Sequence, residues 1–267
     1  MRKLSSSFLR SSHLIGVYGT YLFLYLPIFI LVIFSFNSKR FPSSWDAFTL
    51  HWYRELFHAR DLWLSFFHSL IVATCATFLS LVMGTLLIFF RSQGGKIQKA
   101  LPLFYGNLVI PETILGVNLL TYFSLCQVPL GLPTLVIAHT VLAMGFVVPI
   151  FYTRYSHIDP KLYEVSLILG ATPTQTFFKI TLPLLRPTII ATGLLVFILS
   201  FDDFVLSYFC AGTKVETLSL HLLSMLRLGI TPVINALSTL ILLASALAIA
   251  FLSLPSMRKR MFHNESL

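Results

Sequence analysis

Long apolar runs, separated by short polar segments, dominate the sequence. A helix needs about 20 largely apolar residues to cross the hydrocarbon core of a bilayer. Six stretches fit that requirement: residues 14–36, 62–90, 100–125, 132–152, 184–208 and 232–254. The pattern therefore predicts an all-α integral membrane protein with about six transmembrane helices.

Two of these stretches are interrupted by acidic residues. Glu112 follows Pro111 near the middle of the third stretch, where a proline removes one helical hydrogen bond and the helix is expected to open. Asp202 and Asp203 interrupt the fifth stretch. A charge at bilayer depth costs at least about 2.5–3.5 kcal/mol on insertion scales, so such residues usually face a pathway or a partner. The three acids are therefore candidates for a path followed by a cationic solute.

These acids also have a structural interpretation. Asp203 would cap a helix end or pair with Arg227, and Glu112 would bond to a neighbouring helix. Adjacent residues on a helix point about 100° apart, so only one of Asp202 and Asp203 can face a path squarely. The sequence leaves open which one it is. Tyr208 is among the aromatic residues nearest these acids in the sequence, and it is a further candidate for the path.

Composition excludes a soluble protein. Hydrophobic residues make up 56% of the 267 residues and charged residues only 11%, against roughly 25% charged residues in soluble domains. No linker rich in Pro, Gly or Ser divides the chain, so we expect a single polytopic domain over residues 1–267. The net charge of +9 does not predict a nucleic-acid partner, because basic residues in so apolar a chain mark the cytoplasmic ends of helices.

The basic residues also predict the orientation. Thirteen of the 19 Lys and Arg fall in residues 1–13, 91–99, 154–187 and 255–267. This bias favours both termini in the cytoplasm. The first apolar stretch follows a basic start but is too long for a signal peptide, and no small-residue cleavage site follows it, so we expect a retained anchor.

The sequence shows no pattern typical of an enzyme or a metal centre. The three cysteines (Cys75, Cys126 and Cys210) are far apart, and the eight histidines are scattered. The chain has no GxxxxGK[ST] phosphate loop, so it does not bind ATP in that way. We therefore expect neither catalysis nor a cofactor in this chain. A channel that works without a motor is a rival interpretation.

The long segment between the fourth and fifth stretches, about residues 154–187, has the pattern of two short helices. Glu164 begins a run of good helix formers, and Gly170 is placed where a residue with positive φ stops a helix. Thr172 and Pro173 are an N-cap and a first helical residue. Phe177 and Phe178 then form an apolar knob, and Pro183 and Pro187 are expected to end the segment. The element would dock on a protein or lie on the lipid surface.

This segment resembles the EAA loop of the permease subunits of ABC importers. The resemblance covers Glu164 through Pro187, with Glu164, Gly170, Ala171, Phe177 and Pro183 at the family's positions. Val165-Ser166 departs from the two alanines usual there, but both residues are small. The resemblance implies a type I ABC-importer (MetI-like) permease fold. It also implies that the loop seats on a cytoplasmic ATPase dimer, which binds the ATP and Mg²⁺.

A second resemblance, to spermidine/putrescine permeases, lies in residues 200–209, 211–212, 217–218, 224–225 and 229–236. It implies polyamine import across a bacterial inner membrane, with lipid around the helices, a second permease subunit alongside and a binding protein outside. Cys210 and the segment 214–216 are unusual for that family and leave the cation open. The alternative cargoes are a ferric ion, an amino-acid derivative or a phosphonate.

Overall fold

The computed structural model describes residues 2–39, 44–228 and 232–252. Over these ranges the chain is helical apart from its turns and one isolated bridge between Asn37 and Phe48. The elements, in chain order, are α1 (Arg2–Phe34), α2 (His51–His58), α3 (Arg60–Ser92), α4 (Leu101–Val109), α5 (Glu112–Leu125), α6 (Leu132–Ser156), α7 (Pro160–Ile168), α8 (Pro173–Thr176), the π-helical turn η1 (Phe177–Thr181), α9 (Leu182–Asp202), α10 (Val205–Cys210), α11 (Leu218–Leu228) and α12 (Pro232–Leu252).

By their internal contacts the elements form two compact units. One comprises Met1–Arg60 with Ser224–Leu267, and the other comprises Asp61–Leu223. The second unit contains most of the bundle and every candidate site residue. That the whole chain acts as one polytopic domain stays a prediction.

Within the described residues, four helices are long and apolar enough to cross a membrane: Gly16–Phe34, Arg60–Ser92, Leu132–Ser156 and Pro173–Asp202. The helices α4 and α5 pass the same test together, but the pair is bent by 114° at the break between them. The sixth predicted stretch is covered by α12, which contains the shorter apolar helix Pro232–Leu247. The all-helical membrane fold is therefore confirmed, and the third stretch is broken where we expected a local opening. The orientation of the termini stays a prediction.

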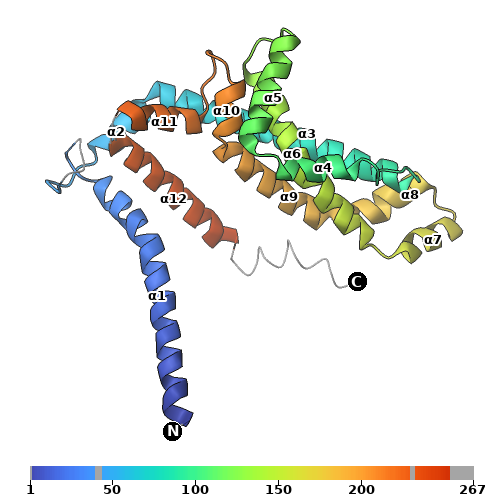
Figure 1. Ribbon diagram of the computed structural model, residues 1–267, viewed down its shortest axis with the longest axis horizontal. Helices are drawn as coiled ribbons and strands as arrows, with labels where there is room; N and C mark the ends of the chain where they lie inside the picture. Colours follow the sequence, from blue (N-terminus) through green and yellow to red (C-terminus); the bar gives the residue numbers. More distant parts are fainter. Residues whose placement is uncertain (1, 40–43, 229–231, 253–267) are drawn as a thin grey trace. The chain divides into compact units, whose positions relative to one another are not determined.

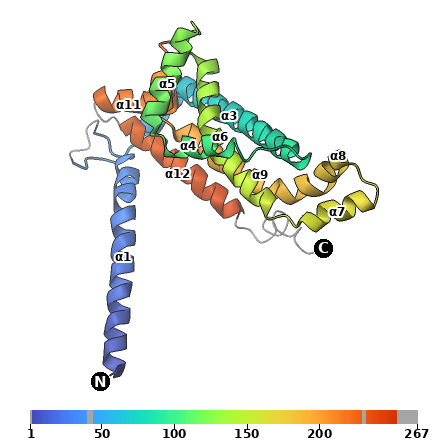
Figure 2. The same ribbon diagram turned by 45° about the vertical axis from the view of Figure 1, so that its right-hand side comes forward.

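The second unit is a bundle built around α6. The helices α4, α9 and α10 pack against α6, and α5 packs against α10. Small residues permit close approach between helices: a Cβ added at Gly84 of α3 would lie 2.4 Å from the Val147 side chain of α6. In both views α7 and α8 lie at the opposite end of this unit from α5 and α10 (Figure 1 and Figure 2). The unit thus carries two candidate sites, one at each end.

The first unit has its own small aromatic core beside α2. The Trp52 indole N–H donates to the Asn37 carbonyl at 2.6 Å. The ring of Phe36 stacks on Phe48, with 5.3 Å between centroids, and lies 5.2 Å from the ring of Tyr53. In this unit α12 packs against both α1 and α2.

Candidate functional site

The helices α7 and α8 form the two-helix element predicted near residues 154–187, which we call the docking element (residues 159–176). The helix α7 begins at Pro160, and the Asp159 carboxylate caps it by accepting the Lys161 amide at 3.0 Å. The prediction that Glu164 stands at the helix start is therefore wrong, because an Asp-Pro pair upstream supplies both the cap and the first helical residue. Glu164 lies in the second turn, is exposed, and lines a cavity of about 370 Å³ with Arg91.

Gly170 ends α7 in the left-handed conformation that the sequence predicts, with a φ of +83°. Its amide donates to the Leu167 carbonyl at 3.0 Å, and the Ala171 amide donates to the Ser166 carbonyl at 3.0 Å. This pair of bonds is a Schellman motif, which satisfies the last carbonyls of a helix. The chain therefore turns sharply at Gly170 and leads directly into α8, with Ala171 half-buried in the turn.

The turn is closed by side-chain hydrogen bonds on both sides of Gly170. Thr172 is the N-cap of α8, as predicted: its hydroxyl accepts the Gln175 amide at 3.2 Å, and the Gln175 side chain accepts the Thr172 amide at 2.9 Å. Between the two helices, the buried hydroxyls of Ser166 and Thr176 are 2.7 Å apart. The docking element is thus a closed unit rather than a flexible loop.

The expected ends of this segment at Pro183 and Pro187 are wrong. The helix runs without a break from Pro173 to Asp202, over 30 residues. The π turn η1 explains how: the Leu182 amide donates to the Phe177 carbonyl, five residues back, and opens the turn just before Pro183. In a regular α-helix the ring of Pro183 would collide with the carbonyl four residues earlier. The wide turn lets Pro183 stand at the start of α9, while Pro187 lies inside that helix.

The two phenylalanines of the predicted knob have different environments. Phe177 is fully buried and packs edge-on against Phe89 of α3, with 5.0 Å between ring centroids. Phe178 is 57% exposed. The exposed apolar surface of the docking element comes from the end of α7, where Ile168 is 83% and Leu169 is 81% exposed. Phe177 therefore ties the element to the bundle, and Ile168 and Leu169 are its free apolar tip.

At the other end of this unit, two helices are broken at the acidic positions. Between α4 and α5, Ile110 and Pro111 have extended backbone with ψ of 126° and 135°. A residue before proline is pushed out of the α region, so this break is set by the sequence. Between α9 and α10, Asp203 has ψ of 128°. Broken helices at membrane depth leave backbone groups free to bind a solute.

The two breaks lie together because α5 packs on α10. A Cβ added at Gly116 of α5 would lie 2.6 Å from the Phe209 ring of α10, so the two helices touch closely there. Glu112 is the first residue of α5, where the helix dipole favours a negative charge, and it is exposed. Tyr208 lies on α10 and is also exposed.

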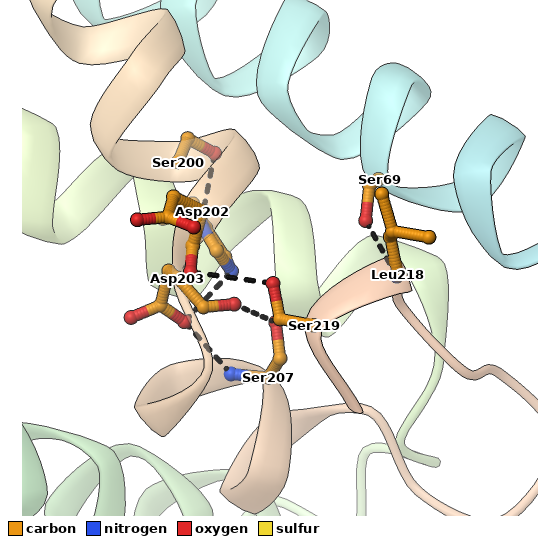
Figure 3. A network of polar contacts seen from close by, with 8 residues as sticks. Ser69, Ser200, Asp202, Asp203, Ser207, Leu218 and Ser219 are labelled. Carbon is orange, nitrogen blue, oxygen red and sulfur yellow. Dashed lines mark hydrogen bonds and ion pairs between the residues drawn. The ribbon is translucent and has the colours of Figure 1, made fainter. Parts of the chain in front are cut away.

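The neighbouring aspartates differ in environment (Figure 3). Asp202 is exposed, and its backbone carbonyl accepts the Ser219 hydroxyl at 3.2 Å. Asp203 is only 8% exposed, and its carboxylate accepts the Ser207 amide at 3.1 Å, which caps α10. Asp203 is thus buried and bonded to α10, whereas Asp202 is exposed, and which of the two faces a transport path stays a prediction.

A buried histidine completes this site. The Nδ1 atom of His139, on α6, is 2.8 Å from the Ser200 hydroxyl on α9, which makes a hydrogen bond between the two helices. Its Nε2 atom is 3.7 Å from the Asp203 carboxylate. The positions of His139 and Asp203 in the sequence do not predict this contact, because it depends on how α6 packs on α9. Among the described residues no group of His, Cys, Asp and Glu could hold a metal ion.

Comparisons with known proteins agree with this architecture. Residues 100–259 match the family model described as "Binding-protein-dependent transport system inner membrane component". The chain is 33% identical over 252 residues to the spermidine/putrescine transport system permease protein PotC of Haemophilus influenzae, covering 94% of this chain and 96% of the relative. It is 34% identical over 229 residues to the putrescine transport system permease protein PotI of Escherichia coli, covering 82% of each chain.

A solved structure shows the same fold. A chain from the crystal structure of a bacterial ABC transporter involved in the import of the acidic polysaccharide alginate superposes with a TM-score of 0.72 at 16% identity, covering 97% of this chain and 98% of that one. At this identity the likeness concerns the fold alone. The family match and the similarity to the relatives show the family and the role. This chain belongs to the family of binding-protein-dependent transport system inner membrane components, and it is a membrane permease of an ABC importer, not an enzyme.

Proposed function

We propose that this permease imports polyamines, spermidine or putrescine, driven by an ATPase that binds the docking element. The observation that carries the proposal is the position of three acids at two helix breaks: Glu112 begins α5 after one break, Asp202 and Asp203 lie at the other, and α5 packs on α10. Acidic groups at the broken helices of a transporter suit a cationic solute. The relatives named as polyamine permeases support the same cargo.

The exposed Asp202 is the group that we assign to the ammonium of the cargo. It is the last residue of α9. Its carboxylate offers acceptor oxygens to an ammonium group, which has three donors. Glu112 adds a second negative charge nearby, and Tyr208 adds an exposed aromatic ring on which a cation can rest.

The docking element is the part that we assign to the ATPase dimer, which binds ATP and Mg²⁺. Its apolar tip, Ile168 and Leu169, is exposed and suits a hydrophobic groove on a partner. Glu164, Gly170 and Ala171 shape the element, and Phe177 fastens it to α3. From Pro173 the helix runs unbroken to Asp202, a length of about 45 Å. Movement of the docking element is thus carried directly to the break at Asp203, with Pro183 at the joint.

The complete importer contains further chains. We assign the docking element to the cytoplasmic side, with both termini of the chain on that side, as the distribution of Lys and Arg predicts. A second permease subunit, either homologous or a copy of this chain, encloses the path. A binding protein outside the membrane delivers the cargo. Alternating access then exposes the acidic breaks first to one side and then to the other.

The test is uptake of labelled spermidine and putrescine by cells that lack their own polyamine importer and express this chain with the neighbouring transporter genes. We expect ATP-dependent uptake that falls in the Asp202→Asn variant. If a correctly assembled complex takes up neither polyamine, the cargo assignment is wrong and the importer architecture remains. Uptake of ferric ion, of an amino-acid derivative or of a phosphonate by the same cells would identify the alternative cargo.

A further inference from the structure

His139 is a buried polar side chain that the proposed transport path leaves without a role. It lies on α6, the central helix of its unit, and is 1% exposed. Nδ1 is hydrogen-bonded to the Ser200 hydroxyl at 2.8 Å. Nε2 has no hydrogen-bond partner among the described residues, and the nearest acidic oxygen is that of Asp203 at 3.7 Å. A buried polar atom without a partner is costly, so this arrangement calls for an explanation.

The bond to Ser200 decides what Nε2 can do. A neutral imidazole carries one proton, and the Ser200 hydroxyl can either donate to Nδ1 or accept from it. If Nδ1 held the proton, the lone pair of Nε2 would face the negative charge of Asp203. When Ser200 donates to Nδ1, Nε2 carries the proton and its N–H faces the Asp203 carboxylate. Electrostatics favours the second arrangement, in which the histidine attracts Asp203 toward α6.

The attraction matters because of where Asp203 stands. Ser200 and Asp203 are three residues apart, so they share one face of the last turn of α9, and that face meets α6. Asp202 points about 100° away from Asp203. Holding Asp203 against α6 therefore fixes the direction in which Asp202 presents its charge.

The far side of the break is held to the same helix. The Thr134 hydroxyl, on α6, donates to the Cys210 carbonyl of α10 at 2.9 Å. Asp203 reaches α10 through the Ser207 amide. The break at Asp203 and Phe204 is thus fixed to α6 on one side by His139 and on the other by Thr134. The 3.7 Å gap lies less than about 1 Å outside hydrogen-bond range, so a small movement of the break would close it.

We infer that His139 is a positioning residue: through Ser200 and Asp203 it holds the break between α9 and α10 so that Asp202 faces the cargo. The inference rests on the proposed function, in which Asp202 binds the ammonium of a polyamine. His139 itself does not touch the cargo.

Two conservative variants separate positioning from simple packing. In His139→Asn the amide can stand near the position of Nδ1 and keep the bond to Ser200, but no donor reaches toward Asp203. In His139→Gln the longer side chain places a donor near the position of Nε2. Thr140→Val is the matched control, because within the described part of the chain the Thr140 hydroxyl bonds only to the Val136 carbonyl of its own helix, at 2.7 Å. All three are measured in the assembled transporter, with ATPase and binding protein, in proteoliposomes.

The first readout is spermidine taken up per ATP hydrolysed, at equal amounts of assembled complex. We expect His139→Asn to lower it roughly tenfold, the size of one hydrogen bond to a charged group, which Nε2 makes with Asp203 when a small movement of the break closes the 3.7 Å gap. We expect His139→Gln to recover most of the parent value and Thr140→Val to remain within about twofold of it. Equal losses in the Asn and Gln variants, or no loss in either, would overturn the inference.

The second readout does not depend on the cargo. The thermal denaturation temperature of the purified complex is measured for His139→Asn, Asp203→Ala and the double variant. If His139 acts through Asp203, the double variant is hardly less stable than Asp203→Ala alone. Additive shifts would overturn the contact. If the parent complex imports no polyamine, only the proposed cargo is refuted. The denaturation temperatures of the two single variants and the double variant would still show whether His139 and Asp203 are coupled.

Discussion

Ser166 of α7 and Thr176 of α8 meet hydroxyl to hydroxyl at 2.7 Å across the turn at Gly170. Both side chains are buried, and each also bonds to a backbone carbonyl: Ser166 to Tyr163 at 2.7 Å and Thr176 to Thr172 at 3.1 Å. The pair joins the two short helices into one body. A force on the tip of α7 therefore reaches α8, and from there the unbroken helix that ends at Asp202.

Removal of this hydroxyl pair is expected to weaken coupling while the protein still inserts. Ser166→Ala removes the bond between the two helices but leaves the Thr176 hydroxyl bonded to the Thr172 carbonyl, so the cost is about 0.5–1.5 kcal/mol. We expect a several-fold loss of uptake per ATP hydrolysed. Ser156→Ala is the control, because the Ser156 hydroxyl is exposed and, among the described residues, bonds only to the Tyr152 carbonyl of its own helix. If both variants transport equally, the pair does not transmit the movement.

Gly170 can be tested against a matched glycine. Gly94 has a φ of +90°, and a Cβ at either position would meet no atom within 4 Å. Gly94 also ends a helix with the same pair of bonds, to the carbonyls of Arg91 and Phe90. Alanine at either position should cost about 1–2 kcal/mol, since both need the left-handed conformation.

Only the change at Gly170 distorts the docking element, so we expect a loss of uptake there and little change for Gly94→Ala at equal amounts of complex. Gly170→Asp should abolish transport and leave insertion intact, because it adds a negative charge at the C-terminal end of α7. Gly170→Asn should retain more activity, because Asn tolerates positive φ and carries no charge. Uptake assays and the amount of protein in the membrane check these outcomes. Normal uptake by Gly170→Asp would refute the assignment of the docking element.

The two aspartates should respond differently to the same substitutions. Asp202→Asn removes an exposed charge and is expected to lower polyamine uptake roughly tenfold, with unchanged stability. Asp203→Asn keeps a side-chain oxygen for the Ser207 amide, and Asn caps helices as well as Asp does, so stability should change little. It removes the charge that attracts His139, so uptake should fall several-fold. Asp203→Ala loses the cap and should lower stability by about 0.5–2 kcal/mol.

Uptake rates and thermal denaturation of the purified complex separate these effects. A severe loss of uptake in Asp203→Asn at normal stability would mean that the charge of Asp203, and not its cap, is what transport requires.

Features set by neighbouring residues were predictable from the sequence, and features set by packing were not. The turn at Gly170 and the cap at Thr172 follow from local backbone preferences, and the break before Glu112 follows from Pro111. The contact of His139 with Asp203 needs α6 and α9 side by side, which no local pattern encodes. The same holds for Phe177 and Phe178: they are identical residues, and the packing of the whole bundle buries Phe177 and leaves Phe178 57% exposed.

The prediction that Pro183 ends the helix is wrong for a related reason, because the local pattern does not show the π turn before it. A proline usually ends a helix, but here the π turn η1 accommodates it, and the helix continues to Asp202. A π turn is one extra residue in an α-helix, so deletion of the exposed Lys179 should convert η1 to regular α-helix. The ring of Pro183 would then meet the carbonyl four residues earlier, at a cost of about 3 kcal/mol.

We therefore expect the Lys179 deletion to impair both stability and uptake, and Pro183→Ala in the same chain to restore stability. Restored stability without restored uptake would mean that transport uses the wide turn itself as a joint between the docking element and α9. Restoration of both stability and uptake would mean that the π turn serves only to avoid the clash between the Pro183 ring and the preceding helical turn. Pro183→Ala alone is the control and should insert and assemble normally. If the deletion has no effect on stability, the wide turn does not relieve the proline.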